Sequence, residues 1–261
     1  MNTIASISTT IRSRLSVAWT WLRARSMQEM IPYAILALIA AMLAGFGQLA
    51  GEVMEGDTHA LDEAVLRALR NPADLADPVG PPWLEGAVRD VTSLGSITVL
   101  TLVTAAAIGY LLMDGKRAAA FFLLVAIAGG GVLSEALKHV FARPRPELVA
   151  HLVDVHTMSF PSGHAMASAV TFLTLGALLT RVQGRRRLKA YLLSIAILLT
   201  FLVGASRVYL GVHWPTDVLA GWCAGAAWAM ACWLLASWLQ RRGQIEQPGH
   251  EPKADAETTR S

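Results

Sequence analysis

The sequence predicts an all-α, polytopic membrane protein with a bundle of six transmembrane helices. Of its 261 residues, 54% are hydrophobic and only 16% are charged, whereas about 25% of the residues of an ordinary soluble domain are charged. A helix needs about 20 mostly apolar residues to cross a bilayer. Six runs approach this length, at residues 31–50, 92–113, 118–141, 161–180, 190–206 and 214–239. Six such runs argue against a soluble helical fold, and the lack of two-residue alternation excludes a membrane barrel.

The charges between these runs predict the orientation of the bundle, because Lys and Arg are retained on the cytoplasmic side of a membrane. Basic residues precede the first run, separate the second from the third and the fourth from the fifth, and follow the sixth. They include Arg23, Arg25, Lys116, Arg117, Arg185, Arg186, Arg187, Arg241 and Arg242. The segment 51–90 is instead rich in Asp and Glu. We therefore expect a multi-pass plasma-membrane (bacterial inner-membrane) protein with both termini in the cytoplasm and the 51–90 loop outside.

The polar ends of the chain set the predicted domain boundaries. Residues 1–30 form a basic leader that is either an amphipathic helix on the inner leaflet or an unstructured segment. The six-span domain covers residues 31–240, and the polar tail at 241–261 has the composition of a disordered segment. No cleavable signal peptide is expected, because the first apolar run is long enough to span and more spans follow it.

The loop at 51–90 contains one predicted helix. Leu61, Val65, Leu66 and Leu69 recur at helical spacing behind a possible cap at Asp57 or Thr58. We expect this helix to lie along the membrane surface. The following NPADLADPVGPP stretch breaks any helix.

Small residues and tryptophans within the runs predict how the bundle is assembled. Small side chains let helices approach closely in lipid, and Trp is typical of the membrane interface. We expect packing roles for Gly129, Gly130, Gly131, Gly221 and Gly225, and interface roles for Trp214, Trp233 and Trp238.

Charged groups gather at the predicted outer ends of three runs, where they are costly and therefore candidates for function. The stretch LSEALKHVFARPRPE carries Lys138, Arg143 and Arg145, SFPSGH carries His164, and GASRVYLGVHWPTD carries Arg207, His213 and Asp217. Any one of these side chains could simply reach toward water at a span end. Positive charge from separate segments is harder to explain on the outer face, and a shared anionic ligand accounts for it better.

Phosphate fits the donors of this cluster. Lys138, Arg145 and Arg207 would neutralise the anion, and Arg offers planar, bidentate N–H donors. Ser162 is suited to cap the fourth span, which leaves the backbone N–H groups of Gly163 and His164 at a helix N-terminus that favours an anion. The missing side chain of Gly163 lets a ligand approach the backbone.

The two histidines predict the reaction. Asp217 follows His213 by four residues around Pro215, so that its carboxylate can fix the imidazole tautomer and leave the other ring nitrogen free to attack. His164 would then protonate the departing oxygen from the opposite side of the phosphorus. This pattern indicates phosphoryl transfer.

Together these residues resemble the type 2 phosphatidic-acid phosphatase family, the lipid phosphate phosphatases that share a site with vanadium haloperoxidases and bacterial class A acid phosphatases. KHVFARPRP matches the first motif (Lys, six residues, Arg-Pro) with Lys138, Arg145 and Pro146, whereas Arg143-Pro144 has the wrong spacing. PSGH (Pro161 to His164) is the second motif. SRVYLGVHWPTD matches the third with Ser206, Arg207, His213 and Asp217. The three motifs cover residues 138–217, and the six-run layout extends the likeness.

The resemblance implies roles for these residues. His213 would attack phosphorus to form a phosphohistidine, His164 would protonate the leaving group and later activate water, and Asp217 would orient His213. Lys138, Arg145, Ser162, Gly163 and Arg207 would hold the phosphate oxygens. The roles inferred from the residues alone agree.

The expected function is hydrolysis of a lipid phosphate or pyrophosphate at the outer leaflet. Undecaprenyl pyrophosphate, phosphatidic acid and phosphatidylglycerol phosphate are the family's usual substrates. A lipid phosphotransferase could use the same intermediate, a vanadate-dependent haloperoxidase is disfavoured because those relatives are soluble, and a non-catalytic scaffold would have no reason to keep both histidines.

The expected partners are the lipid substrate and the bilayer, with no nucleic acid, while the oligomeric state stays open. No metal or other cofactor is expected, because no carboxylate or His cluster has ligand spacing. Cys223 and Cys232, nine residues apart on one predicted helix, have neither disulfide nor metal-ligand spacing. Loop residues His151 and His156 either touch the substrate or are simply solvated.

Overall fold

The computed structural model describes residues 27–153 and 157–245. The predicted leader at 1–30 lies almost entirely outside the described residues, as do His156 and most of the predicted tail. The chain forms two compact units, Met1–Leu38 and Ile39–Ser261. Helix α2 (Met27–Glu55) runs across the boundary, and the features below belong to the second unit.

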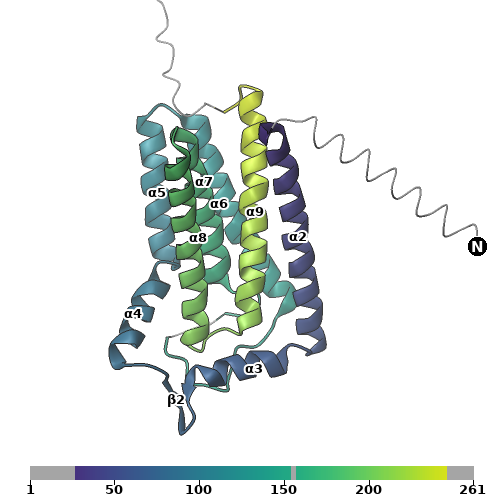
Figure 1. The fold of residues 1–261 in the computed structure, drawn as a ribbon, viewed down its shortest axis with the longest axis vertical. Coiled ribbons are helices and arrows are strands. Elements are labelled where there is room, and N and C mark those ends of the chain that lie inside the picture. Colours follow the sequence, from purple (N-terminus) through teal and green to yellow (C-terminus); the bar gives the residue numbers. More distant parts are fainter. Residues whose placement is uncertain (1–26, 154–156, 246–261) are drawn as a thin grey trace, which may run out of the picture. The chain divides into compact units, whose positions relative to one another are not determined.

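Long helices dominate this unit (Figure 1). After α2 they are α3 (His59–Ala68), α4 (Pro82–Ser93), α5 (Ile97–Met113), α6 (Arg117–Phe141), α7 (Gly163–Val182), α8 (Arg186–Tyr209) and α9 (Pro215–Arg241). Within the described residues, five helices are long and apolar enough to cross a bilayer, and the bent pair α4–α5 makes a sixth if it counts as one span. The predicted helical membrane bundle is confirmed.

The second predicted span differs from the structure at its start. Residues 92 and 93 end α4, a break follows, and α5 begins at Ile97. The two helices meet at an angle of 47°. The Oγ of Ser96 accepts a hydrogen bond from the N–H of Val99 (3.2 Å), so that α5 has its own cap. Helix α4 was missed because Pro81-Pro82 was interpreted as a breaker, whereas Pro82 occupies the first turn, where its missing N–H costs nothing.

Residues 51–55 end α2, and the rest of the 51–90 segment folds into α3, a short hairpin and most of α4, all at one end of the α5–α9 bundle (Figure 1). The helix predicted in this segment is confirmed as α3, but its predicted cap is wrong, because Thr58 occupies the N-cap position without a side-chain hydrogen bond. Its place along the membrane surface stays a prediction. Strands β1 (Arg70–Asn71) and β2 (Asp74–Pro78) pair antiparallel where only a loop was expected. Side chains close this turn, since the N–H of Ala73 donates to Asn71 Oδ1 (3.1 Å).

Helix α7 is the packing centre of the bundle, because it contacts α5, α6, α8 and α9. Glycines make these contacts close. A Cβ at Gly225 would lie 2.7 Å from the carbonyl oxygen of Met166, and one at Gly221 would lie 2.8 Å from that of Ser162. The predicted packing role also holds for Gly129 and Gly130 on α6, but not for Gly131, where a Cβ would meet nothing within 4 Å. The N-terminal half of α7 is therefore locked against α9.

Trp214 departs from its predicted role as an interface anchor. Its side chain is buried (6% exposed), and its indole N–H donates to the carbonyl of Pro144 at 3.2 Å. The guanidinium of Arg143 lies 5.4 Å from the centre of its ring. Trp214 thus joins the start of α9 to the segment after α6, whereas Trp238 remains 47% exposed, as an interface anchor requires.

Candidate active site

The last turn of α6 and the segment after it carry the first two predicted phosphate ligands. Helix α6 ends at Phe141, and Ala142 after it adopts the left-handed conformation (φ 42°), where the chain leaves the helix for the RPRP stretch. Lys138 Nζ lies 3.3 Å from the Oγ1 of Thr157, and Arg145 donates to the carbonyl and the Oγ1 of that residue at 2.7 and 3.1 Å. Thr157 therefore holds both cations side by side.

The PSGH stretch forms the start of α7, with Ser162 at the N-cap position. The Ser162 side chain makes no capping hydrogen bond, and its fully buried Oγ has no partner among the residues that the structure describes, which corrects the expectation that this hydroxyl caps the helix. A Cβ at Gly163 would lie 3.1 Å from Lys138 Nζ, so the glycine lets the ammonium reach the helix N-terminus. The result is a positive end of a helix dipole beside a lysine and an unsatisfied hydroxyl.

Arg207, at the end of α8, supplies a third cation. Its side chain is only 3% exposed, its Nη1 donates to Thr92 Oγ1 at 3.0 Å, and its Nε is buried without a partner. The unsatisfied N–H of Arg207 and the hydroxyl of Ser162 are buried polar groups of the kind that a bound anion satisfies. Thr92 therefore fixes Arg207 while leaving a donor open.

The turn between α8 and α9 places His213. Gly211 has a φ of 74°, and a Cβ there would lie 2.6 Å from Arg70 Nη2 and 2.7 Å from Val149 Cγ2. The turn therefore needs glycine for both its conformation and its close contacts. Arg70 is buried and donates to the carbonyl of Tyr209 at 2.9 Å, which ties the turn to β1.

His213 and Asp217 form the predicted buried pair. His213 Nδ1 lies 3.4 Å from Asp217 Oδ2, and the two side chains are 2% and 0% exposed. The same oxygen accepts hydrogen bonds from the backbone N–H of Trp214 (2.9 Å) and from the hydroxyl of Ser159. On the other side of the ring, Nε2 lies 3.1 Å from Arg145 Nη1. The carboxylate of Asp217 therefore faces Nδ1 of the ring, and Arg145 of the cation cluster faces Nε2.

The structure brings the predicted residues together at one end of the bundle. His164 lies within electrostatic reach of Lys138, Arg145, Arg207 and His213. A Cβ at Gly95, in the break between α4 and α5, would lie 3.4 Å from the His164 ring. His164 is thus bounded by the α4–α5 break on one side and by the cations on the other.

Several residues at this site were missed from the sequence. Thr157 holds two cations, Ser159 binds Asp217, and Thr92 holds Arg207. Arg143, set aside because of its motif spacing, donates to Asp217 Oδ1 at 2.7 Å and to Asp62 Oδ2 at 2.8 Å. The repeated Arg-Pro was the one signal in the sequence that could have drawn attention to Arg143.

Within the described residues, the hydrogen bond of His151 lies outside the cluster. His151 is exposed, and its Nε2 donates to the carbonyl of Pro146 at 2.6 Å, within the loop that follows α6. Within residues 27–153 and 157–245, no group of three or more His, Cys, Asp or Glu side chains is arranged to hold a metal ion.

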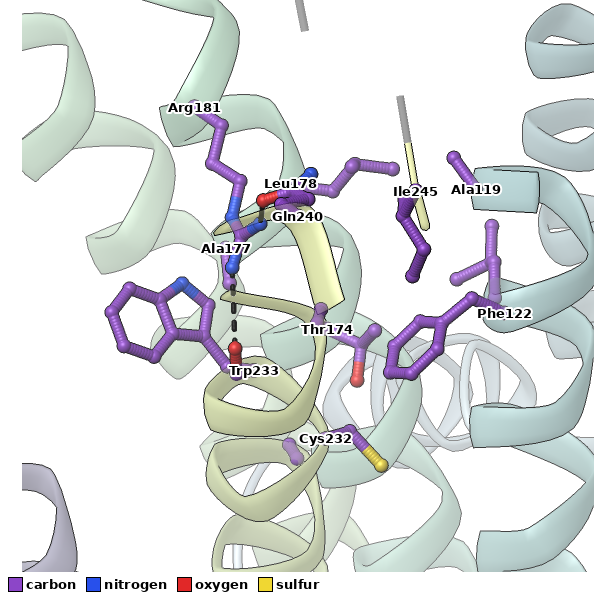
Figure 2. Close-up of a pocket in the computed structure, with 13 residues that line it drawn as sticks. Ala119, Phe122, Thr174, Ala177, Leu178, Arg181, Cys232, Trp233, Gln240 and Ile245 are labelled. Carbon is purple, nitrogen blue, oxygen red and sulfur yellow. Dashed lines mark hydrogen bonds between the residues drawn. The ribbon is translucent and has the colours of Figure 1, made fainter. Parts of the chain in front are cut away.

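A cavity of about 50 Å³ lies elsewhere, at the C-terminal part of α7, and none of the motif residues lines it (Figure 2). Arg181 points along α9, where its guanidinium donates to the carbonyl of Trp233 (3.2 Å) and the hydroxyl of Ser237 (2.7 Å) and also reaches Gln240. These α9 acceptors satisfy the guanidinium. Arg181 therefore joins α7 to α9 rather than to a ligand.

A helical membrane bundle with a buried His–Asp pair beside clustered cations defines the class of a membrane-embedded phosphatase. The family model of the PAP2 superfamily matches residues 119–241. Phosphatidylglycerophosphatase B of Bacillus subtilis is 31% identical over 179 residues, which cover 68% of this chain and 84% of that protein. An undecaprenyl-diphosphatase of Sulfolobus acidocaldarius is 34% identical over 121 residues, 44% of this chain and 54% of that protein.

Solved structures agree with the sequence comparisons. The crystal structure of a transmembrane PAP2-type phosphatidylglycerolphosphate phosphatase from Bacillus subtilis has a TM-score of 0.70 at 28% identity and covers 78% of this chain and 98% of that one. Aquifex aeolicus LpxE has a TM-score of 0.51 at 27% identity, covering 66% of this chain and 94% of that one. The chain belongs to the PAP2 superfamily, as its three motifs predicted, and it is a membrane lipid phosphatase.

The burial of His213 leads to a prediction about pH. Burial lowers the pKa of His213 to about 4 from its usual 6.5, the nearby charges of Arg145 and Arg207 act in the same direction, and the hydrogen bond to Asp217 opposes them. The neutral imidazole is then fully present near pH 6.5 and is lost only as the pH falls through about 4. We expect the acidic limb of kcat/KM, corrected for substrate ionisation, to have its midpoint near pH 4. A limb centred on the ordinary histidine value would contradict the neutral, buried state.

Proposed function

We propose that this chain removes the terminal phosphate of a lipid phosphate or lipid pyrophosphate through a phosphohistidine on His213. The observation that carries the proposal is the orientation of the His213 ring, with Nδ1 toward buried Asp217 and Nε2 3.1 Å from Arg145. A carboxylate at Nδ1 keeps that nitrogen protonated and leaves the lone pair of Nε2 for attack. Nε2 also lies on the side of the cations that a phosphate requires.

The residues at the site can supply the nucleophile, the proton and the positive charge that the two steps of the reaction require. The lone pair of His213 Nε2 forms a bond to phosphorus while the bond from phosphorus to the lipid oxygen breaks, and His164 gives its proton to that oxygen. Water then attacks the phosphohistidine and His164 takes the proton of this water. The bond from phosphorus to Nε2 breaks, its electron pair returns to Nε2, and inorganic phosphate leaves. Lys138, Arg145 and Arg207 neutralise the charge of the equatorial oxygens throughout. Ser162 Oγ and the backbone N–H of Gly163 add neutral donors.

The substrate class follows from the surroundings of the site and from the relatives. Two of them are named as phosphatidylglycerophosphatase B and undecaprenyl-diphosphatase. We take phosphatidylglycerol phosphate, undecaprenyl pyrophosphate and phosphatidic acid as the candidate substrates. The three share a phosphate at the end of a long hydrocarbon, and this shared chemistry is what the chain is proposed to recognise.

An apolar groove further along α7 from His164 supports a lipid substrate. A cavity of about 440 Å³ lies between α5, α6 and α7, and Ile97, Leu100, Ala167 and Thr171 are among its lining residues. Ala167 and Thr171 follow His164 by three and seven residues, so they continue along the same face of α7. A leaving oxygen that takes its proton from His164 thus has its hydrocarbon directed into this groove.

Filling the groove tests this assignment. A Cβ at Gly131 would meet nothing within 4 Å, and the residue lines the groove, so Gly131→Leu fills the space without a clash. Displacing about two methylene groups of the substrate costs about 1.6 kcal/mol, or about 15-fold in affinity. We expect KM to rise by this order for long-chain lipid phosphates and to stay unchanged for p-nitrophenyl phosphate. Gly109→Leu, on α5 but outside the groove, is the matched control, and equal effects on both substrates would contradict the assignment.

We propose that the site faces the outside of the cell, on the basis of the basic loops at the opposite ends of the spans. Single cysteines at Ala76 and Ala150, both exposed at the site end of the bundle, are expected to react with an impermeant thiol reagent in intact cells. A cysteine at Gln183 is expected to stay unlabelled. The background lacks Cys223 and Cys232, and the reverse labelling pattern would place the site in the cytoplasm.

The nucleophile is tested by trapping the intermediate. We expect acid-labile, base-stable phosphate labelling in the wild type and none in His213→Ala, because His213 is the histidine, among those the structure describes, whose Nδ1 faces Asp217 and whose Nε2 is thereby left for attack. Asp217→Asn is expected to retain a small remainder of activity, since the ring survives in a poorer orientation. Substantial turnover in His213→Ala would rule out this nucleophile.

The role of His164 is tested by the leaving group. If His164 protonates the departing oxygen, His164→Ala loses about 10²- to 10⁴-fold on a phosphomonoester such as phosphatidic acid. The loss is expected to be smaller on undecaprenyl pyrophosphate, whose departing phosphate is already a stable anion. Equal losses on both substrates would assign His164 to binding or structure instead of proton transfer.

A further inference from the structure

Arg143 lies between two buried carboxylates that come from distant parts of the chain. Its Nη1 donates to Asp217 Oδ1 at 2.7 Å, and its Nη2 donates to Asp62 Oδ2 at 2.8 Å. Both carboxylates are fully buried and the Arg143 side chain is 11% exposed. Removing one partner of such a buried ion pair strongly destabilises the fold, because the other charge stays buried without compensation.

The two arginines of the RPRP stretch contact opposite ends of the His213–Asp217 pair. Arg145 lies 3.1 Å from His213 Nε2, the nitrogen proposed to attack phosphorus. Arg143 instead contacts the carboxylate that lies on the Nδ1 side of the ring. The hydrogen bonds of Arg143 go to Asp62, Thr216 and Asp217, so its guanidinium is already engaged without a phosphate.

The two oxygens of Asp217 have separate partners. Oδ2 faces His213 Nδ1, the N–H of Trp214 and the hydroxyl of Ser159. Within the part of the chain that the structure describes, the hydrogen bond to Oδ1 comes from Arg143. Arg143 therefore decides both the charge that the carboxylate can keep and the rotation that presents Oδ2 to the imidazole.

Asp62 completes this arrangement from helix α3. Its Oδ1 accepts from the backbone N–H of Thr216 at 3.0 Å and its Oδ2 accepts from the hydroxyl of Thr216 at 2.6 Å, which caps the start of α9. The same carboxylate balances the charge of Arg143. The neighbouring Glu63 is different, since it pairs with His59 and Arg67 on the surface of α3.

We propose that Arg143 and Asp62 are positioning residues that act on the nucleophile through Asp217, an inference that rests on the proposed function of His213. Arg143 holds Asp217 ionised, with Oδ2 toward Nδ1, and Asp62 holds Arg143 in place. An ionised Asp217 keeps the proton on Nδ1 and the lone pair on Nε2 of His213. The α3 helix is thus part of the catalytic architecture although it lies outside the three motifs.

The charged groups around Asp217 determine what happens to its carboxylate when Arg143 is removed. Positive charge comes from Arg143 directly and from Arg145 through the imidazole, and the negative charge nearest to Arg143, besides Asp217, is Asp62. Without Arg143, two carboxylates of like charge remain buried in one small region. Proton uptake or rotation of Asp217 then relieves the repulsion, and either change removes the correct tautomer of His213.

The test is a set of variants assayed for kcat and KM on a lipid phosphate in detergent. Arg143→Met is expected to lower kcat about 10- to 100-fold, the range typical when the partner that orients a functional histidine is lost. KM is expected to stay within about twofold, because Arg143 is not proposed to bind phosphate. Arg143→Lys keeps the charge and recovers part of kcat. Asp62→Asn keeps one acceptor oxygen, replaces the other with an NH₂ donor and removes the charge that balances Arg143, and is expected to give a smaller loss than Arg143→Met. Glu63→Gln is the matched control on α3.

Non-additivity separates positioning from a general loss of structure. In an Asp217→Asn background the carboxylate charge is gone, so Arg143→Lys and Asp62→Asn are expected to change kcat by less than about twofold. Full, additive losses in that background, or a KM that rises with the fall in kcat, would overturn the proposal even if Arg143→Met does not fold. His213→Ala in the same assay distinguishes failure of the proposed function from failure of the positioning role. Activity in His213→Ala would refute the proposed function. An inactive His213→Ala together with unaffected Arg143 and Asp62 variants would refute the positioning role alone.

Discussion

The carboxylate of Asp217 is a negative charge buried at the end of a membrane bundle, and the site depends on its compensation. Uncompensated burial of an ionised group costs at least several kcal/mol. Here the charge is met by Arg143, by the hydroxyl of Ser159 and by the N–H of Trp214, with His213 at 3.4 Å. These partners come from the loop after α6, the approach to α7 and the turn before α9. One carboxylate therefore fixes three separate segments relative to one another.

The backbone reinforces this arrangement through α7 and α9. The N–H of Ser162 donates to the carbonyl of Asp217 at 2.9 Å, and Gly221 and Gly225 bring α9 against the first turns of α7. The hydroxyl of Ser162 and the Nε of Arg207 stay unsatisfied in a buried region. Rigid helices that hold open donors in place need little reorganisation when an anion binds, which is how preorganised sites stabilise developing charge.

The sequence predicted the parts of this account that depend on short-range spacing. His213 and Asp217 are four residues apart and PSGH is contiguous, so their local geometry follows from the start of a helix. Asp62 and Arg143 are separated by 81 positions, and Arg207 and Thr92 by 115, and nothing in one sequence pairs such residues. Thr157 and Ser159 lie in a loop without a periodic pattern, and α4 was missed because its first turn contains the prolines that usually end a helix. The length of an apolar run predicts a membrane span. The contacts of buried polar side chains such as Asp62 and Thr92 depend on the tertiary fold, which a single sequence does not reveal.

The central claim is that His213 Nε2 is the atom that bonds to phosphorus within the cradle of cations. A crystal structure of the protein with vanadate, which can adopt the trigonal-bipyramidal geometry of the transferring phosphoryl group, tests this most directly. The account predicts vanadium bonded to His213 Nε2, with the oxygens contacting Ser162 Oγ and Arg207 Nε, which have no hydrogen-bond partner among the described residues. Vanadium bonded to His164, or vanadate bound away from both histidines, would contradict it.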